Sequence, residues 1–290
     1  MEIPKIQWYP GHIAKAERKL SEIIKRVDLV IEVRDARIPL STSHTHLNNW
    51  IQGKKHLLVI NKADMISPKA KESWHKWFIN RKEFPIWCNS KKGEGIKELC
   101  KASIALRESI DSRRISRGMK IRPIRALTLG FPNVGKSALI NRIANRRVVQ
   151  SARKAGVTRA LHWIRLDNGI DLLDAPGIIP PDLEDQKSAL NLAICDDIGE
   201  AAYDLVSVAE EFIKILHKLH NNPISSISTK MITNRYGVDI KEAFKEPDKW
   251  LKLTASLHTS HDKKRMAYRL LEDFRTQMLG EICLEAPNGF

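Results

Sequence analysis

Residues 127–143, "LTLGFPNVGKSALINRI", decide the fold. They contain GFPNVGKS, a match to the GxxxxGK[ST] phosphate-binding loop, between an apolar run that predicts a strand and a run that predicts a helix. In such loops backbone N–H groups surround the β-phosphate of a nucleotide, and the positive end of the helix dipole faces it. We therefore expect Lys136 to contact the β- and γ-phosphates and the Ser137 hydroxyl to bind Mg²⁺.

A second phosphate-side element follows about forty residues later. In "DLLDAPG" (171–177) Asp174 ends an apolar strand, where a carboxylate acting on Mg²⁺ is expected, and Gly177 can offer its N–H to the γ-phosphate. DxxG alone also fits an ordinary turn glycine, but its position after a phosphate loop favours the nucleotide role. Thr158 of "AGVTRA" is the expected switch threonine and a further Mg²⁺ ligand; the alternative is an ordinary loop residue.

The motif that would recognise the base comes before the phosphate loop. "VINKAD" (59–64) matches NKxD after a predicted strand. The Asp64 carboxylate can accept hydrogen bonds from guanine N1–H and the exocyclic amine, and adenine has neither group there. Asn61 is expected to tie the loop and contact the base edge, and the Lys62 stem to lie against the base plane.

A looser candidate for the guanine O6 site is "CNSKKGEGI" (88–96), after the third predicted strand, with a backbone N–H at Asn89–Ser90 as donor. The full set predicted to contact the nucleotide is Asn61, Lys62, Ala63, Asp64, Asn89, Ser90, Asn133, Val134, Gly135, Lys136, Ser137, Ala138 and Gly177. The predicted ligands are therefore GTP or GDP with Mg²⁺, and the predicted reaction is GTP hydrolysis.

The order base motif, phosphate loop, switch threonine, DxxG indicates a circular permutation. A sheet can be cut at another exposed loop if its old ends are joined. We predict an α/β fold: a circularly permuted Ras-like P-loop GTPase domain over residues 1–180, with 97–122 as the joining segment. A switch or linker (181–195) and a smaller, mainly helical RNA-binding domain (196–290) follow. Because DxxG leads into that domain, loss of the γ-phosphate is expected to reposition it.

Hydrophobic periodicity predicts the individual elements. Strands are expected at 27–35, 56–61, 84–88 and 124–131, and a pair over 161–174 joined by the turn "DNG"; helices are expected at 13–26, 68–81 and 135–144. One helix is expected to place Leu205, Val208, Phe212, Ile215 and Leu219 on a single face. The next strong strand signal after it is "EICLE" (281–285).

The charge of the 290-residue chain predicts a polyanionic partner. It carries 49 Lys and Arg against 34 Asp and Glu, a net charge of +15, with clusters at 111–125 and 142–159. Few aromatic residues interleave with them, so folded RNA is favoured over single strands; a merely basic surface or an anionic membrane is the alternative. There is no apolar run of membrane length and no secretory signal, and four scattered cysteines fit a reducing compartment, so we expect a cytoplasmic monomer.

The chain resembles the circularly permuted ribosome biogenesis GTPase A (YlqF/RbgA) family. The resemblance is carried by "WYPGHIAKA" (8–16), "DARIP" (35–39), "NKAD", "GFPNVGKS", "GVTR", "DAPGI" and "LLEDFRTQMLGEICLE" (270–285). It implies a factor acting late in assembly of the large ribosomal subunit, with ribosomal RNA as partner and hydrolysis stimulated by the particle. It also implies a helical C-terminal domain similar to RNA-binding antiterminator regulators.

Hydrolysis needs a polar group that DxxG does not supply, because Ile178 stands where many GTPases have a water-orienting Gln. The resemblance implies His12 in that role; the alternative is a structural or RNA-contacting histidine. It also implies that Asn133 holds K⁺, and otherwise Asn133 makes a loop hydrogen bond. Asp35 and Arg37 could pair with each other or support the switch region.

Two other functions stay open from the sequence. One is an RNA-attached scaffold whose nucleotide site is only structural, which Ile178 favours. The other is a GTPase acting on the small ribosomal subunit. The complete set of nucleotide motifs favours the large-subunit enzyme.

Overall fold

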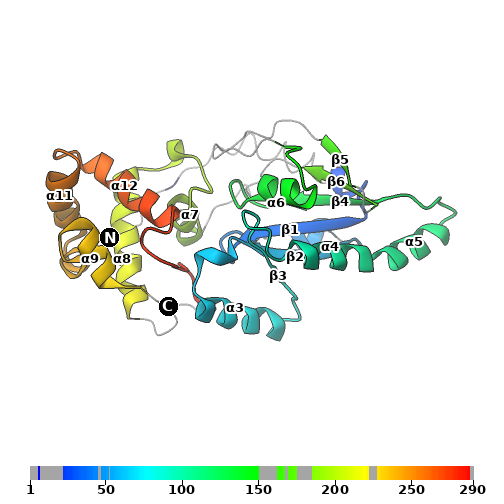
Figure 1. Cartoon of the computed structure of the whole chain (residues 1–290), viewed down its shortest axis with the longest axis horizontal. Coiled ribbons are helices and arrows are strands. Elements are labelled where there is room, and N and C mark those ends of the chain that lie inside the picture. Colours follow the sequence, from blue (N-terminus) through cyan, green and yellow to red (C-terminus); the bar gives the residue numbers. More distant parts are fainter. Residues whose placement is uncertain are drawn as a thin grey trace.

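A six-stranded sheet forms one part of the computed structural model, which describes residues 6, 22–44, 47–51, 53–149, 162–166, 169–174, 185–221 and 227–287. The strand order is β3-β2-β1-β4-β6-β5. The strands are β1 (Leu29–Asp35), β2 (Lys55–Asn61), β3 (Ile86–Trp87), β4 (Ile124–Leu129), β5 (His162–Leu166) and β6 (Ile170–Asp174). All six were predicted from the sequence. Figure 1 shows the sheet at one end of the molecule and helices α8, α9, α11 and α12 at the other.

Five of the six strands are parallel, and only β5 runs antiparallel, against β6. Their carboxyl ends therefore meet at one edge of the sheet, which is where open α/β sheets bind ligands. The phosphate loop follows β4, NKxD follows β2 and DxxG begins at the end of β6. The permuted connectivity thus brings motifs that are far apart in sequence to the same edge.

Both faces of the sheet are covered, so β1 is buried at every residue. Leu29, Ile31 and Val33 belong to the apolar cluster that includes α4 (Ile96–Ala105) and α6 (Lys136–Ile143). Val30, on the opposite face, joins a cluster with residues of β4 and of the short helix α2 (Leu47–Trp50).

Helix α3 (Pro68–Asn80) covers the β2 side of that opposite face. Ser67 caps its first turn by accepting from the Ala70 N–H, and proline at the first helical position fits because its missing N–H would be unsatisfied there. Trp74 and Phe78 are fully buried against β2. A single turn of 3₁₀ helix, η1 (Ala63–Met65), connects β2 to α3.

The joining segment contains α4 and α5 (Arg107–Ile115), and α5 lies at the end of the sheet remote from the helical region (Figure 1). The chain then returns from α5 to β4, and Asp28 binds this returning stretch. Asp28 lies just before β1 and is 7% exposed. Arg122 Nη1 lies 2.8 Å and Arg114 Nη1 3.4 Å from the Asp28 carboxylate, and the Arg125 N–H donates to it at 3.0 Å. Asp28 therefore joins the end of α5 and the start of β4 to the beginning of β1.

The helical region comprises α7 (Gln186–Ile194), η2 (Glu200–Ala202), α8 (Leu205–His220), α9 (Thr229–Tyr236), α10 (Ile240–Lys245), α11 (Pro247–His258) and α12 (Lys263–Arg275). Side chains of Asp185, Asp204, Ser228, Asp239 and Asp262 cap five of these helices. Such caps satisfy N–H groups that no helical carbonyl can reach.

The predicted apolar face of α8 is confirmed except at one position. Leu205, Val208, Phe212 and Leu219 are buried, but Ile215 is only half-buried and Leu216 takes the central place. Leu216 continues the buried face where Ile215 was expected. Both residues fit helical spacing with the other apolar positions, so the sequence pattern does not decide between them. One apolar cluster runs continuously from the sheet through α7, α8 and α12.

The segment after α12 returns to the sheet, but "EICLE" is not a strand, contrary to the sequence signal. It makes one backbone bond to the sheet part, from the Leu284 N–H to Arg37 O at 2.8 Å. Glu285 accepts hydrogen bonds from the N–H groups of Leu40 and Ser41. Within the described ranges, none of the helices has the length and apolarity that a bilayer crossing requires.

Candidate guanine nucleotide site

The phosphate loop connects β4 to α6 and places Lys136 in the first helical turn. The Lys136 side chain is 7% exposed, and its Nζ donates to the carbonyls of Gly130 at 3.1 Å and Phe131 at 2.7 Å. Burial lowers the pKa of Lys136 to about 8, although the negative charges of Asp174 and Asp197 oppose that shift. The Lys136 ammonium is thus held by carbonyls of the phosphate loop. A bound phosphate would raise the pKa of Lys136 and so favour the fully charged form.

Two glycines of the motif are required by close contacts rather than by turn geometry alone. A Cβ on Gly130 would lie 2.3 Å from the Val33 carbonyl oxygen of β1. A Cβ on Gly135, whose φ is +97°, would lie 2.3 Å from Asn61 Nδ2. The second contact shows why the phosphate loop and the base motif can touch: only glycine leaves room for the Asn61 side chain.

Asn61 joins three loops through its side chain, which is 2% exposed. Its Nδ2 donates to Val134 O of the phosphate loop at 2.8 Å. Its Oδ1 accepts from the Ser90 N–H at 3.1 Å and from the Ser90 hydroxyl at 2.7 Å. Ala63 adds a backbone bond to Cys88 O at 3.0 Å. The three segments predicted to contact the nucleotide therefore converge at one place.

The loop predicted to bind guanine O6 uses its first N–H groups inside the protein. The Asn89 N–H donates to Glu94 O, and the Ser90 N–H donates to Asn61. The next two, on Lys91 and Lys92, donate to Asn89 Oδ1 at 3.0 and 3.1 Å. In this structure Asn89 and Ser90 therefore shape the loop, and neither presents a free N–H as the sequence analysis expected.

Lys62 lies in a buried ionic cluster with Asp35, Arg37 and Asp197, called the ionic cluster below. Lys62 Nζ is 2.6 Å from Asp35 Oδ2 and 3.8 Å from Asp197 Oδ1. Arg37 binds Asp35 through two side-chain bonds, Nε to Oδ1 at 3.0 Å and Nη2 to Oδ2 at 2.8 Å. Of the two roles open to Asp35 and Arg37, pairing with each other is observed.

Burial and charge act in opposite directions on the two carboxylates of the ionic cluster. Burial alone would raise the pKa of Asp35, but Arg37 and Lys62 outweigh it and hold the pKa far below its ordinary value. Burial raises the pKa of Asp197 to about 7, and Lys62 only partly counters this. Asp35 is therefore the firmly ionised partner of both cations.

Asp64 and Asn133 belong to two of the converging loops, the base motif and the phosphate loop. Asp64 belongs to η1 and is half-buried; its backbone O accepts from Gln277 Nε2 at 2.6 Å, and no described residue donates a hydrogen bond to its carboxylate. Asn133 has a left-handed backbone (φ +55°), and its Nδ2 donates to Asp196 O at 2.5 Å. This is a loop hydrogen bond, the alternative considered for Asn133.

Hard oxygen ligands suited to Mg²⁺ stand at the expected place. Asp174 ends β6, is 1% exposed and pairs in register with Thr128 of β4. The Ser137 hydroxyl lies in the first turn of α6, immediately after Lys136, whose pKa responds to the charge of Asp174. A carboxylate and a hydroxyl beside a phosphate loop fit an ion that prefers oxygen ligands and substrate phosphates.

Three predicted site residues, His12, Thr158 and Gly177, lie outside the described residues, as does Ile178. Ala138 is described; with Ser90, Asn141, Arg142, Asn145 and Arg146 it lines a surface pocket of about 290 Å³. Of the predicted set, the structure thus brings together the residues at or just after the carboxyl ends of β2, β3 and β4, with Asp174 at the end of β6.

Three residues of this region were not predicted from the sequence. Arg142, assigned to a polyanion-binding run, donates through Nε to Ser90 O at 3.2 Å and through Nη2 to Lys91 O, so it joins α6 to the loop after β3. Asp196 and Asp197 come from the segment after α7. Neither Arg142 nor the Asp196–Asp197 pair belongs to a recognisable sequence motif. For the two aspartates, the one available signal was their position directly after an apolar helical run, in "LAICDD".

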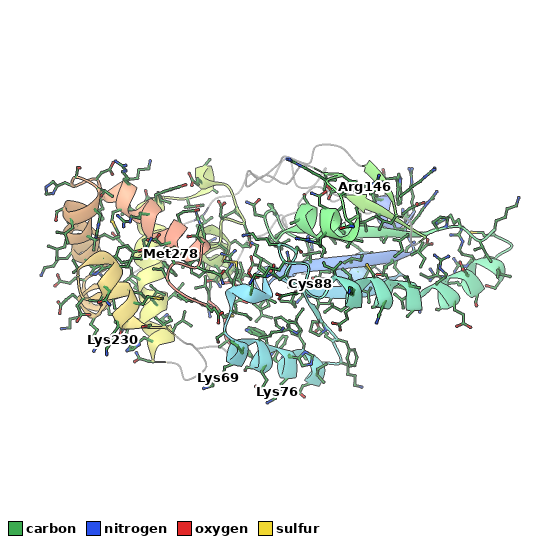
Figure 2. All side chains as sticks on the ribbon, in the orientation of Figure 1. Lys69, Lys76, Cys88, Arg146, Lys230 and Met278 are labelled. Atoms are coloured by element: carbon green, nitrogen blue, oxygen red, sulfur yellow. The ribbon has the colours of Figure 1, made fainter. Side chains whose placement is uncertain are left out.

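The basic runs are only partly available to a partner. Arg114 and Arg122 bind Asp28 and Arg142 binds carbonyls, so three of these arginines have structural contacts. Arg146 and Arg147 after α6 are exposed. Figure 2 shows Arg146 at the sheet end, Lys69 and Lys76 projecting outward from α3, and Lys230 on the helical region. Positive charge is thus spread over both parts of the molecule.

The fold and this convergence of loops define a P-loop GTPase with Ras-like strand order and circularly permuted connectivity, followed by a mainly helical C-terminal part. The sequence profile described as "50S ribosome-binding GTPase" matches residues 125–233. "Ribosome biogenesis GTPase A" of Bacillus cereus is 34% identical to the chain, covering 98% of it and 95% of the relative. The chain belongs to the ribosome biogenesis GTPase A family.

Two further comparisons agree with this assignment. "Ribosome biogenesis GTPase A" of Bacillus pumilus is 33% identical, covering 98% of the chain and 99% of the relative. The structure of GNP-bound YlqF from T. maritima has a TM-score of 0.64 and 22% identity, covering 95% of the chain and 100% of that protein. The latter supports the fold alone.

Proposed function

We propose that this GTPase acts in a late step of large ribosomal subunit biogenesis and that the ribosomal particle stimulates its hydrolysis. The observation that carries the proposal is the convergence of three loops at Asn61. The buried Asn61 amide bonds both the phosphate loop and the loop after β3, and the NKxD motif that it begins ends at Asp64. A site assembled this way can hold a guanine and a triphosphate together. The names of the family's members supply the ribosomal context.

In the proposed site the base is held by Asp64, with Asn61 positioning the loops and the Lys62 stem beside the ring. The phosphates are held by the backbone of residues 133–138, by Lys136 and by the Gly177 N–H. Mg²⁺ would be bound by Ser137, Thr158 and Asp174, where it neutralises developing charge on the β- and γ-phosphates. Asn133 would contribute its side-chain oxygen to a K⁺ site, since the bond to Asp196 O uses only its Nδ2.

The proposed domain limits are 1–180 for the GTPase domain, 181–195 for the linker and 196–290 for an RNA-binding domain. Helix α7 falls within that linker and packs against α8, which favours counting α7 with the helical domain. The net charge of +15 supports ribosomal RNA as a partner, and we propose a cytoplasmic monomer.

GTP turnover by the full chain is expected to rise at least about tenfold with purified large subunits or their precursors and not with small subunits. Phosphate release is measured with each particle, in potassium and in sodium salts; the potassium proposal predicts the faster rate in potassium. Stimulation by small subunits alone would contradict the large-subunit assignment. Turnover that no particle changes would favour a scaffold with a structural nucleotide.

His12→Ala is expected to lower particle-stimulated turnover about 100-fold and to leave GTP affinity nearly unchanged. The reason is that a histidine orienting water or moving a proton contributes to the chemical step and not to ground-state binding. Stimulated rates and nucleotide affinity are measured for both proteins, with His75→Ala, on the outer part of α3, as the matched control. Equal stimulated rates would remove His12 from the mechanism.

A further inference from the structure

The turn that ends α7 contacts the ionic cluster and the nucleotide loops with three consecutive residues, Cys195, Asp196 and Asp197, called the 195–197 turn below. Arg37 Nη2 donates to Cys195 O at 3.2 Å, and Asn133 Nδ2 donates to Asp196 O at 2.5 Å. Asp197 Oδ1 lies 3.8 Å from Lys62 Nζ. The helical region therefore touches the phosphate loop and the base motif directly, and not only through the chain that follows DxxG.

The conformation of the 195–197 turn is fixed by α7 itself. Asp196 has a left-handed backbone (φ +65°); its N–H donates to Ala193 O at 3.2 Å, and the Asp197 N–H donates to Leu192 O at 2.8 Å. This is the Schellman arrangement, which satisfies the last carbonyls of a helix. Arg275 of α12 also bonds the carbonyls of Ala193 and Ile194. The position of Asp197 thus follows that of the helical region.

The Asp197 side chain is buried with an ion-pair contact to Lys62 but with no hydrogen-bond donor among the described residues. It is 0% exposed, and among the described residues no donor lies within hydrogen-bonding distance of either carboxylate oxygen. Burying a carboxylate costs several kcal/mol unless nearby charge compensates for it. The nearest cation is Lys62 Nζ, which Asp35 holds from the other side at 2.6 Å.

We propose that Asp197 is a positioning residue of the guanine nucleotide site, contributed by the helical region, which together with Asp35 sets the place of Lys62. The inference rests on the proposed contact between Lys62 and the nucleotide. Both carboxylates attract the Lys62 ammonium. The Lys62 side chain is therefore held in one conformation, with its stem beside the base. Without Asp197, the Lys62 ammonium is attracted by Asp35 alone and moves towards the end of β1.

This arrangement couples the helical region to nucleotide affinity. A nucleotide that needs Lys62 in this position stabilises the docked 195–197 turn, and docking of the turn strengthens nucleotide binding by the same factor. A partner that moves α7 would therefore change nucleotide affinity without touching the nucleotide.

The test is a double-mutant cycle on the full chain with a fluorescent GDP analogue, in the absence of ribosomal particles. Binding is measured at pH 8, where the Asp197 carboxylate is mostly ionised because its pKa is raised only to about 7. Asp197→Asn keeps the shape and backbone of the turn and removes the charge. It is expected to weaken GDP binding about tenfold, mainly through faster dissociation. Lys62→Met, which keeps an apolar stem, is expected to weaken binding too, and adding Asp197→Asn to it is expected to cause no further loss.

Asp273→Asn is the matched control. Asp273 is another carboxylate of the helical region, 7% exposed, but it binds Arg235 and Tyr236, away from the nucleotide loops. Its replacement is expected to lower the melting temperature and leave GDP affinity unchanged. If Asp197→Asn behaves like this control, or if its effect simply adds to that of Lys62→Met, the proposal is overturned. Unchanged affinity in Lys62→Met would overturn it as well.

These outcomes are separate from those that test the ribosomal role. GDP affinity is measured without particles, so a failure of large-subunit stimulation leaves the Asp197 result standing. Conversely, normal stimulation with additive effects in the cycle removes only the Asp197 inference.

Discussion

Asp64→Asn is expected to lose GDP affinity by about 100- to 10,000-fold and to gain affinity for XDP. In the proposed site the carboxylate accepts two hydrogen bonds from guanine, each worth about 1.5–3 kcal/mol because the acceptor is charged. The asparagine amide would place an N–H against the guanine amine, whereas xanthine has a carbonyl there that can accept from it. Asp64 is half-buried and no described residue donates to its carboxylate, so the change spares other contacts.

Competition of GDP, XDP and ADP against a fluorescent nucleotide measures this specificity. Asp64→Ala is the matched control, since it should lose GDP binding without gaining XDP binding. Equal affinity of the unmodified protein for adenine and guanine nucleotides would contradict the assigned base site. Unchanged GDP binding in Asp64→Asn would move base recognition to another residue.

Asp35→Ala is expected to destabilise the fold by about 3–5 kcal/mol, the cost of removing one partner from a buried ion pair. It would leave Arg37, which is 2% exposed, without its bidentate partner and Lys62 with only the more distant Asp197. For a chain of this size the first thermal transition should fall by about 10 °C. Nucleotide-free protein is used, so that ligand binding does not contribute to the measured stability.

Glu72→Ala provides the matched control, because Glu72 forms an exposed ion pair with Lys76 on α3 at 2.7 Å. Such pairs contribute about 0–1 kcal/mol, so its melting temperature should change by at most a few degrees. Asp35→Asn, which keeps one acceptor for Arg37, should lie between the two. A loss of less than about 1 kcal/mol in Asp35→Ala would show that the ionic cluster relaxes into water when its anion is removed.

Local motifs made most of the fold predictable. The phosphate loop, NKxD and DxxG each follow a run of apolar residues, and each run is a strand in the structure. The motif order indicated a circularly permuted Ras-like sheet, and the structure supplies its strand order. The pairing of Asp35 with Arg37 was also within reach, since only one residue separates them.

Contacts between distant segments could not be read from the sequence. Asp28 holds arginines 86 and 94 positions away, and nothing in the joining segment marks them as internal partners and not as surface charge. Asn133 meets Asp196 across 63 positions. In the loop after β3, the N–H groups of Lys91 and Lys92 donate to the Asn89 side chain. These bonds depend on the conformation of the loop, which the spacing of residues does not specify.

The returning C-terminal segment constrains how the two parts of the molecule can move. The chain connects the sheet to α7, and the segment beyond α12 binds back through Leu284 to Arg37 and through Glu285 to Leu40 and Ser41. The helical region is also bonded to the sheet part at Asp64, through Gln277, and at Arg37 and Asn133, through the 195–197 turn. A displacement of the helices relative to the sheet therefore has to break bonds at the C-terminal segment as well as at that turn.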